Sequence, residues 1–260
     1  MITRFIDSIG LVSLNICNQF GLYGQFLSST FVVMFTQRLN VKKFFVQMER
    51  IGVDSLPICS LIGVFSGAVM TLQTYYGFAK FGSENMIGPV VALSLTRELG
   101  PVLTGIMVTG RCGSSIAAEI GTMRITEQID ALETLCIDIF RYLMVPRVLA
   151  SIVILPFVTL FTMFFGIWGG YIIYRYYFHL NAIEFTEGIK DFLELSDITG
   201  GLIKGSVFGL LLSSIGSFFG YYTRGGAKGV GSSTIQSVVV ASIAILISNY
   251  FLAMLLFEKT

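Results

Sequence analysis

Five apolar stretches, each long enough to cross a lipid bilayer as a helix, constrain this 260-residue chain more than any other feature. A helix needs about 20 mostly apolar residues to cross about 30 Å of hydrocarbon. Charged residues make up 13% of the chain, whereas soluble domains carry about 25%. The sequence therefore predicts an all-α integral membrane protein. The five stretches are residues 56–78, 86–109, 142–174, 198–222 and 235–257.

The first 50 residues differ from the rest. Residues 1–35 mix apolar side chains with Asn, Gln, Ser and Gly, too polar for a span and too apolar for a soluble tail. Residues 36–52 place four basic side chains beside two phenylalanines, as in amphipathic segments that lie against anionic lipid headgroups. We expect one domain over 1–260, with an interfacial N-terminal helical region at 1–50 and a transmembrane core at 51–260. The four basic residues are Arg38, Lys42, Lys43 and Arg50.

Lys and Arg are distributed unequally between the two sets of loops. Cytoplasmic loops of membrane proteins carry an excess of these residues. The distribution therefore predicts a cytoplasmic N-terminus, a cytoplasmic connector at 110–140 and an external C-terminus. The polar segment at 178–197 is then expected to form a short external helix. The eleven inner residues are Arg4, Arg38, Lys42, Lys43, Arg50, Arg111, Arg124, Arg141, Arg147, Arg224 and Lys228, and the five outer ones are Lys80, Arg175, Lys190, Lys204 and Lys259.

Arg97 and Glu98 are adjacent charges inside the second apolar stretch. Glu98 lies roughly 18 Å into that stretch at about 1.5 Å per residue, where a charge must be paired or hydrated. Neighbours on a helix do not face each other, so the two cannot fully neutralise one another. Pro101 frees the carbonyl of Arg97 and predicts a kink. We expect a polar cavity or a second subunit here, or alternatively a buried ion pair, with Gln73 nearby, that only fixes packing.

The connector at 110–140 contains an amphipathic segment, residues 123–135. Apolar Ile125, Ile129 and Leu132 share one face, and three acidic residues lie on another. A helix that lies on a membrane carries Lys and Arg instead. The acidic face therefore indicates a soluble partner with a basic surface, although a merely solvated face has the same pattern. The acidic residues are Glu127, Asp130 and Glu133.

Glycines recur at four-residue spacing in three of the apolar stretches, a pattern that lets membrane helices approach closely. Gly63 and Gly67 form one pair, and Gly166 and Gly170 form another. The fourth stretch carries the most extended ridge. That ridge consists of Gly201, Gly205 and Gly209, followed by Gly216 and Gly220.

Enzymatic and metal-binding readings have little support in the sequence. The phosphate-binding pattern G-x-x-x-x-G-K-[ST] is absent, so we expect no ATP hydrolysis by this chain through that route. The four cysteines lack C-x-x-C spacing and His179 is the only histidine, which disfavours a metal cluster. No basic domain is available for nucleic acid. We therefore expect neither catalytic residues nor a cofactor bound by this chain.

Four motifs in the chain closely resemble the MlaE permease family, the membrane subunits of ABC-type phospholipid transporters. The resemblance extends over most of the chain from about residue 52, and the first 40 residues match only in character. The motifs are L-T-R-E-L-G-P-V at 95–102, G-R-C-G-S-S-I-A-A-E-I-G-T-M at 110–123, T-E-Q-I-D-A-L at 126–132 and G-I-W-G-G at 166–170.

The resemblance implies an assembly in a bacterial inner membrane or, in a plastid descendant, the inner envelope. It implies a homodimeric permease with five spans per chain, two copies of a P-loop ATPase that holds ATP and Mg, and an external MCE-domain protein that exchanges phospholipid. Some systems of this family add a small STAS-domain protein.

The resemblance also implies roles for residues. Arg97 and Glu98 would line a lipid cavity near the dimer interface, with Pro101 beside them and Gln73 as a weaker candidate for the wall. The glycine ridge of the fourth stretch would suit close packing there. The segment 122–135 looks like the coupling helix that docks on the ATPase. Its docking residues would be Thr126, Glu127, Asp130, Leu132 and Glu133.

The first hypothesis is therefore the permease subunit of an ATP-driven phospholipid transporter. The alternative from another class is an ion- or proton-coupled secondary transporter in which Glu98 titrates. A third possibility is a membrane scaffold without transport, in which both charges are structural.

Overall fold

The structure, a computed structural model, describes residues 2–257, and of residues 2–13, 15, 16 and 257 the backbone alone. Within that range every regular element is helical. The α-helices are α1 (Ile2–Thr36), α2 (Val41–Ile51), α3 (Leu56–Phe78), α4 (Ile87–Ser94), α5 (Gly100–Val108), α6 (Ser114–Ile125), α7 (Gln128–Thr134), α8 (Val145–Ile172), α9 (Ala182–Phe192), α10 (Leu195–Tyr221) and α11 (Gly226–Phe257). Single turns of π-helix lie at Leu95–Leu99, Thr109–Gly113, Phe140–Met144 and Ile173–Tyr177, and 3₁₀ turns at Val53–Ser55, Ala79–Phe81 and Glu84–Met86.

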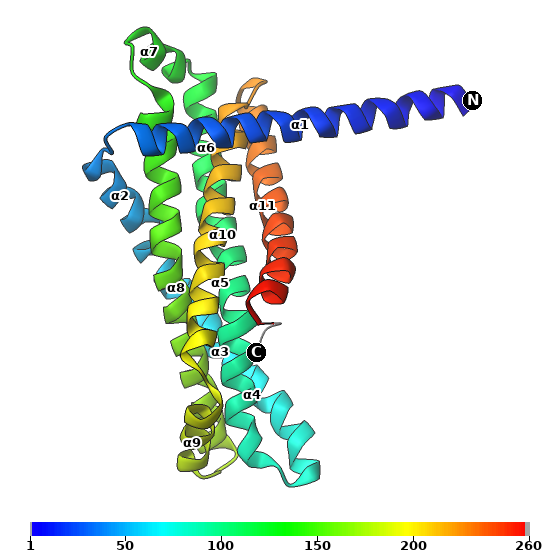
Figure 1. Ribbon diagram of the computed structural model, residues 1–260, viewed down its shortest axis with the longest axis vertical. Helices are drawn as coiled ribbons and strands as arrows, with labels where there is room; N and C mark the ends of the chain where they lie inside the picture. The colour runs from blue at the N-terminus through cyan, green and yellow to red at the C-terminus, as the bar shows by residue number, and fades with distance from the viewer. Residues whose placement is uncertain (1, 258–260) are drawn as a thin grey trace.

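The long helices form an elongated bundle with α7 at one end and α9 at the other (Figure 1). Five helical stretches are long and apolar enough to cross a membrane, which confirms the prediction of five spans. Most of them extend beyond the predicted bounds, because the helices continue past the hydrocarbon-like residues. These stretches are Val41–Phe81, Glu84–Ile125, Phe140–Tyr177, Leu195–Tyr221 and Gly226–Leu256.

The connector predicted at 110–140 is wrong over its first half, because the second span continues as helix to Ile125. A glycine of α10 allows this helix to pack closely against it. A Cβ added to Gly216 of α10 would lie 2.9 Å from the carbonyl oxygen of Gly113, closer than carbon and oxygen tolerate. The small residues therefore bring this helix against α10, and the path from the second span to α7 contains no loop before Thr126.

Glycine pairs bring α3 and α8 into backbone contact. A Cβ on Gly67 would overlap the carbonyl group of Gly166, and a Cβ on Gly63 would lie 2.6 Å from the carbonyl oxygen of Thr162. Such contact replaces the hydrophobic driving force that lipid removes between membrane helices.

The ridge Gly201, Gly205 and Gly209 lies inside the chain. Added Cβ atoms there would meet Met163, Thr159 and Ser151, all on α8. The three glycines are buried. The expectation that this ridge packs at a dimer interface is therefore corrected, because α8 of the same chain already covers it.

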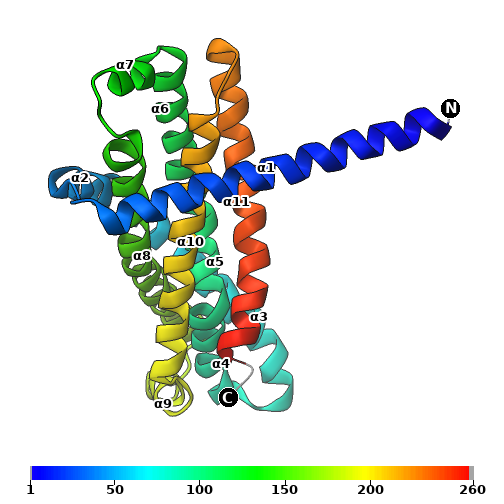
Figure 2. The same cartoon turned by 45° about the horizontal axis from the view of Figure 1, so that its top comes forward.

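Helix α1 runs across the bundle near the α7 end, as the two views agree (Figures 1 and 2). Phe26 is 2% exposed and packs on Phe140 and Phe218. The Tyr23 hydroxyl lies 2.8 Å from Ser214 Oγ of α10. Burial raises the pKa of Tyr23, which the hydrogen bond to Ser214 partly offsets, so the phenol remains neutral at physiological pH.

Asparagine side chains cap the starts of two shorter helices, α2 and α9. Asn40 accepts a hydrogen bond from the backbone N–H of Lys43 at the start of α2, and Asn181 accepts one from Ile183 at the start of α9. Such caps satisfy the free donors of a first helical turn. Helix α9 buries Phe185 against Tyr174 at the end of the bundle opposite α7.

We expect Gly67→Ala to destabilise the protein by about 1–3 kcal/mol, because the added methyl group overpacks the α3–α8 contact. Gly77→Ala on the same helix is the matched control, since nothing lies within 4 Å of a Cβ at that position. The control should be neutral or slightly stabilising. Thermal unfolding of both variants in detergent measures the difference, and equal midpoints would refute the packing role of Gly67.

Candidate functional site

Arg97 and Glu98 lie in the π-helical turn Leu95–Leu99, directly before Pro101. The N–H of Gly100 donates to the carbonyl oxygen of Leu95, five residues earlier. Such wide turns are frequent at functional sites. The chain stays helical on both sides of Pro101, and the kink at this residue stays a prediction.

Arg97 pairs with Asp197 in the first turn of α10. Arg97 Nε lies 2.6 Å from Asp197 Oδ1. Asp197 is 1% exposed, and its other carboxylate oxygen accepts the N–H of Glu194 at 3.0 Å. The sequence placed Asp197 in an external polar segment. It is instead buried, because it caps α10 and neutralises Arg97 at once.

Glu98 pairs with Lys204, two turns further along α10. Lys204 Nζ donates to Glu98 Oε1 and to the carbonyl oxygen of Arg97, both at 2.8 Å. That carbonyl is the one that Pro101 deprives of its helical donor. Lys204 is fully buried within α10, so the prediction that it is an outer-loop residue is wrong.

A third helix, α11, also contacts Glu98. Asn249 of α11 donates from Nδ2 to Glu98 Oε2 at 2.8 Å, and its own Oδ1 is buried without a partner among the described residues. Sequence reasoning missed Asn249, Asp197 and Lys204. The available signal was the polarity of Lys204 and Asn249 within otherwise apolar stretches.

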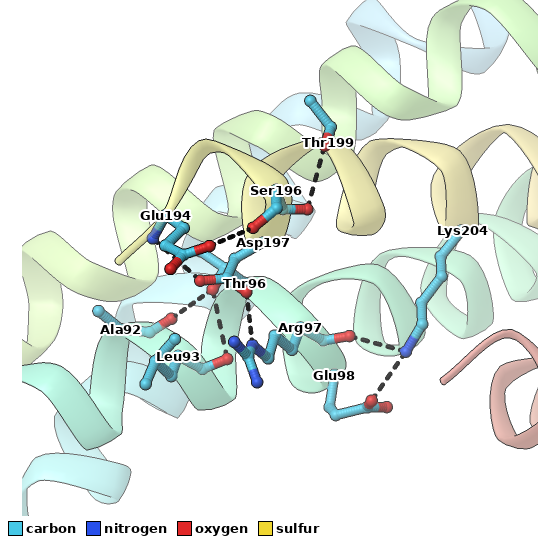
Figure 3. Close-up of polar contacts among 10 residues, drawn as sticks. All are labelled: Ala92, Leu93, Thr96, Arg97, Glu98, Glu194, Ser196, Asp197, Thr199 and Lys204. Carbon is cyan, nitrogen blue, oxygen red and sulfur yellow. Dashed lines mark hydrogen bonds and ion pairs between the residues drawn. The ribbon is translucent and has the colours of Figure 1, made fainter. Parts of the chain in front are cut away.

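The five residues form what we call the charged cluster: Arg97, Glu98, Asp197, Lys204 and Asn249. Residues seven apart on a helix share a face, and in Figure 3 α10 presents Asp197 and Lys204 to the two neighbours on the π-helical turn. The cluster holds two cations and two anions and is formally neutral. Asp197 and Lys204 are buried, whereas the side chains of Arg97 and Glu98 are 34% and 42% exposed.

The other two predicted cavity residues, Pro101 and Gln73, do not belong to the charged cluster. Pro101 is buried behind the cluster. Gln73 is exposed on α3 and takes no part in the charged cluster.

The predicted docking segment forms the end of the bundle at α7. Ile129 is fully buried, and Leu132 packs on the same core. Thr126 ends α6, and Glu127 takes a left-handed backbone with φ 58° before α7 begins. Glu127 and Glu133 are exposed. The apolar face thus anchors α7 on the bundle, and the acidic face points away from it.

Asp130 differs from the other two acidic residues of α7. It accepts a hydrogen bond from Arg124 at 2.7 Å, and the Arg124 guanidinium lies 5.5 Å from the ring centre of Tyr221. Asp130 is therefore partly neutralised within the chain and fixes α7 relative to α6. Beside α7, a hollow of about 340 Å³ extends to Tyr221.

Comparison with known proteins finds relatives over nearly the whole chain. The model of a family described as Permease MlaE matches residues 44–255. A probable ABC transporter permease protein of Rickettsia typhi is 43% identical over 258 residues, 99% of this chain and all of the relative. The intermembrane phospholipid transport system permease protein MlaE of Haemophilus influenzae is 33% identical over 99% of both chains. The chloroplastic protein TRIGALACTOSYLDIACYLGLYCEROL 1 of Arabidopsis thaliana is 39% identical over 82% of this chain and 61% of its own length.

We expect Glu98→Gln to destabilise the chain by about 3 kcal/mol, because it leaves the buried Lys204 without a carboxylate. Lys204→Met alone should also destabilise, and the double variant should recover more than half of the summed loss. Asp130→Asn, which breaks the exposed pair with Arg124, serves as control and should cost less than about 1 kcal/mol. Unfolding in mixed micelles measures all four variants. Strictly additive losses at Glu98 and Lys204 would contradict the pairing.

Proposed function

The chain belongs to the MlaE permease family, and from this premise we propose that it moves phospholipid between the inner membrane and an external MCE-domain carrier. It is an ABC transporter permease and a multi-pass inner-membrane protein, a transport subunit and not an enzyme. The energy source in our proposal is ATP, held with Mg by a separate P-loop ATPase. Two copies of this chain would form the membrane part.

The partial exposure of Arg97 and Glu98 is the observation that carries this proposal. Charged side chains at bilayer depth do not face lipid tails, and instead face protein or a water-filled cavity. In the single chain both remain more than a third exposed. A second copy, or a wet cavity between two copies, would complete their surroundings. Such a cavity, with apolar walls and a few charges, suits an amphipathic lipid.

The distribution of basic residues supports an orientation. With Lys204 inside the bundle, eleven Lys and Arg belong to the α7 side, and among the described residues three, Lys80, Arg175 and Lys190, belong to the α9 side. By the positive-inside rule, the α7 end would be cytoplasmic together with the N-terminus, and the C-terminus would be external. Helix α1 would then lie at the cytoplasmic membrane surface, and α9 would face the external carrier.

Helix α7 is the proposed contact with the ATPase. Its buried Ile129 holds it on the bundle, and its exposed Glu127 and Glu133 offer negative charge to a basic groove. Thr126 and Leu132 would frame that contact. From Ile125 back to Leu95 the chain is helical throughout, so a displacement at α7 would reach the charged cluster along one continuous helix.

We expect the triple change Glu127→Lys, Asp130→Lys and Glu133→Lys to weaken binding of the ATPase about tenfold or more, because like charges would then meet across the contact. The matched control is Glu184→Lys, Glu187→Lys and Asp191→Lys on α9, which makes the same charge change at the opposite end. Co-purification and ATP hydrolysis by the complex measure both. Unchanged ATPase binding by the α7 variant would refute the docking assignment.

The proton-coupled alternative predicts transport that depends on a proton gradient and not on ATP. Lys204 is buried and donates to Glu98, so in our proposal this carboxylate holds Lys204 in place and does not carry a driving ion. In proteoliposomes that contain the complex, lipid transfer should require ATP, and a proton gradient without ATP should drive none. Transfer that is driven by the gradient alone and lost in Glu98→Gln would establish the alternative.

A further inference from the structure

A second group of charged residues lies apart from the charged cluster, where α2 faces α6 and the beginning of α8. A hollow of about 520 Å³ separates α2 from α6 and α8 there. Four of its lining residues are basic and one is acidic, which gives it a surplus of positive charge. The basic residues are Lys42, Lys43, Arg50 and Arg147, and the acidic one is Glu119.

Arg147 is the buried basic residue of this hollow, held in place by two contacts within the chain. It is 4% exposed. Its Nη1 donates to the carbonyl oxygen of Leu143 at 2.8 Å, and its Nη2 lies 3.1 Å from Glu119 Oε1. Its Nε is buried and has no hydrogen-bond partner among the described residues. A buried guanidinium N–H without an acceptor is costly, so the acceptors of the described residues do not fully satisfy Arg147.

Glu119 does not balance the positive charge around it. The same Oε1 atom that pairs with Arg147 lies 3.7 Å from Arg50 Nη1. One carboxylate thus serves two guanidiniums, while Lys42 is exposed at the rim. An anion with several acceptor oxygens would satisfy these donors together.

We propose that this hollow binds the phosphate group of an anionic phospholipid. Guanidinium groups bind phosphate oxygens with paired, charge-assisted hydrogen bonds. Helix α2 places Lys42 and Arg50 at the hollow and exposes apolar Phe45 and Val46, which is typical of a helix at the headgroup level. The choice of a lipid rests on the proposed function, in which this end of the bundle lies at the cytoplasmic leaflet. Free phosphate offers the same chemistry.

Occupancy of the hollow would act on the helix that leads to α7. A phosphate at Arg50 competes with Glu119, which belongs to α6. Helix α6 ends next to α7, the proposed ATPase contact. The site therefore connects a headgroup in the leaflet with the cytoplasmic end of the second span.

The test uses the full chain in an uncharged detergent, with bound lipids counted by native mass spectrometry. The probes are dioleoylphosphatidylglycerol, dioleoylglycerol as the phosphate-free match, and inorganic phosphate followed by its effect on the melting temperature. The site variant is Lys42→Gln with Arg50→Gln. The control, Lys80→Gln with Lys190→Gln, removes the same charge from the opposite end. Glu119→Gln removes the competing carboxylate.

We expect the site variant to bind phosphatidylglycerol about tenfold more weakly, the control to bind it normally, and Glu119→Gln to bind it more tightly. Dioleoylglycerol should not bind measurably. Stabilisation by inorganic phosphate in the unaltered chain and not in the site variant would identify free phosphate as a sufficient ligand, and its absence would assign the site to the lipid. Equal phosphatidylglycerol affinity in the site variant and the control would overturn the proposal. No ATPase is needed, so this result is independent of ATP-driven transport.

Discussion

Two ion pairs between α10 and one π-helical turn determine how the spans of this protein pack. Each pair joins a buried partner, Asp197 or Lys204, to a half-exposed one, Arg97 or Glu98. Because a buried charge that loses its partner is strongly destabilising, the register of α10 is fixed at two points two turns apart. The glycine ridge of α10 allows the approach to α8 that this register requires. Charge and shape therefore specify the same arrangement.

The second span forms a helical path from the charged cluster toward the α7 end of the molecule. Residues 95–125 form helix throughout, with one π-helical turn at each end of α5. The small residues between Gly110 and Ala118 pack this helix against α10 and α11, so they stiffen the path where a glycine-rich loop would soften it. In our proposal, the turn at Thr126 and Glu127 that carries α7 and the charged cluster thus lie toward opposite ends of one continuous helix.

The sequence predicts the five spans well, because apolar length is a local property. It also predicts that Arg97 and Glu98 must find other partners, and that Pro101 frees a carbonyl. It does not identify Asp197, Lys204 or Asn249, because these lie 100 to 151 residues away in the chain and meet the pair only through packing. Loop-charge counting then misplaces Lys204. Likewise, a glycine such as Gly113 has the same local pattern in a flexible connector and in the helix contact with Gly216 that it makes here.

The ion pairs of α10 also bear on how the chain enters the membrane. Inserted alone, a helix with Asp197 and Lys204 would pay up to about 2.5–3.5 kcal/mol for Lys204 and less for Asp197, which lies in its first turn. Their partners belong to a helix about a hundred residues nearer the N-terminus, so the ribosome delivers the partners first. Helix α10 can therefore insert beside a surface that already neutralises it, and α11 then adds Asn249. The order of synthesis and the order of charge neutralisation coincide.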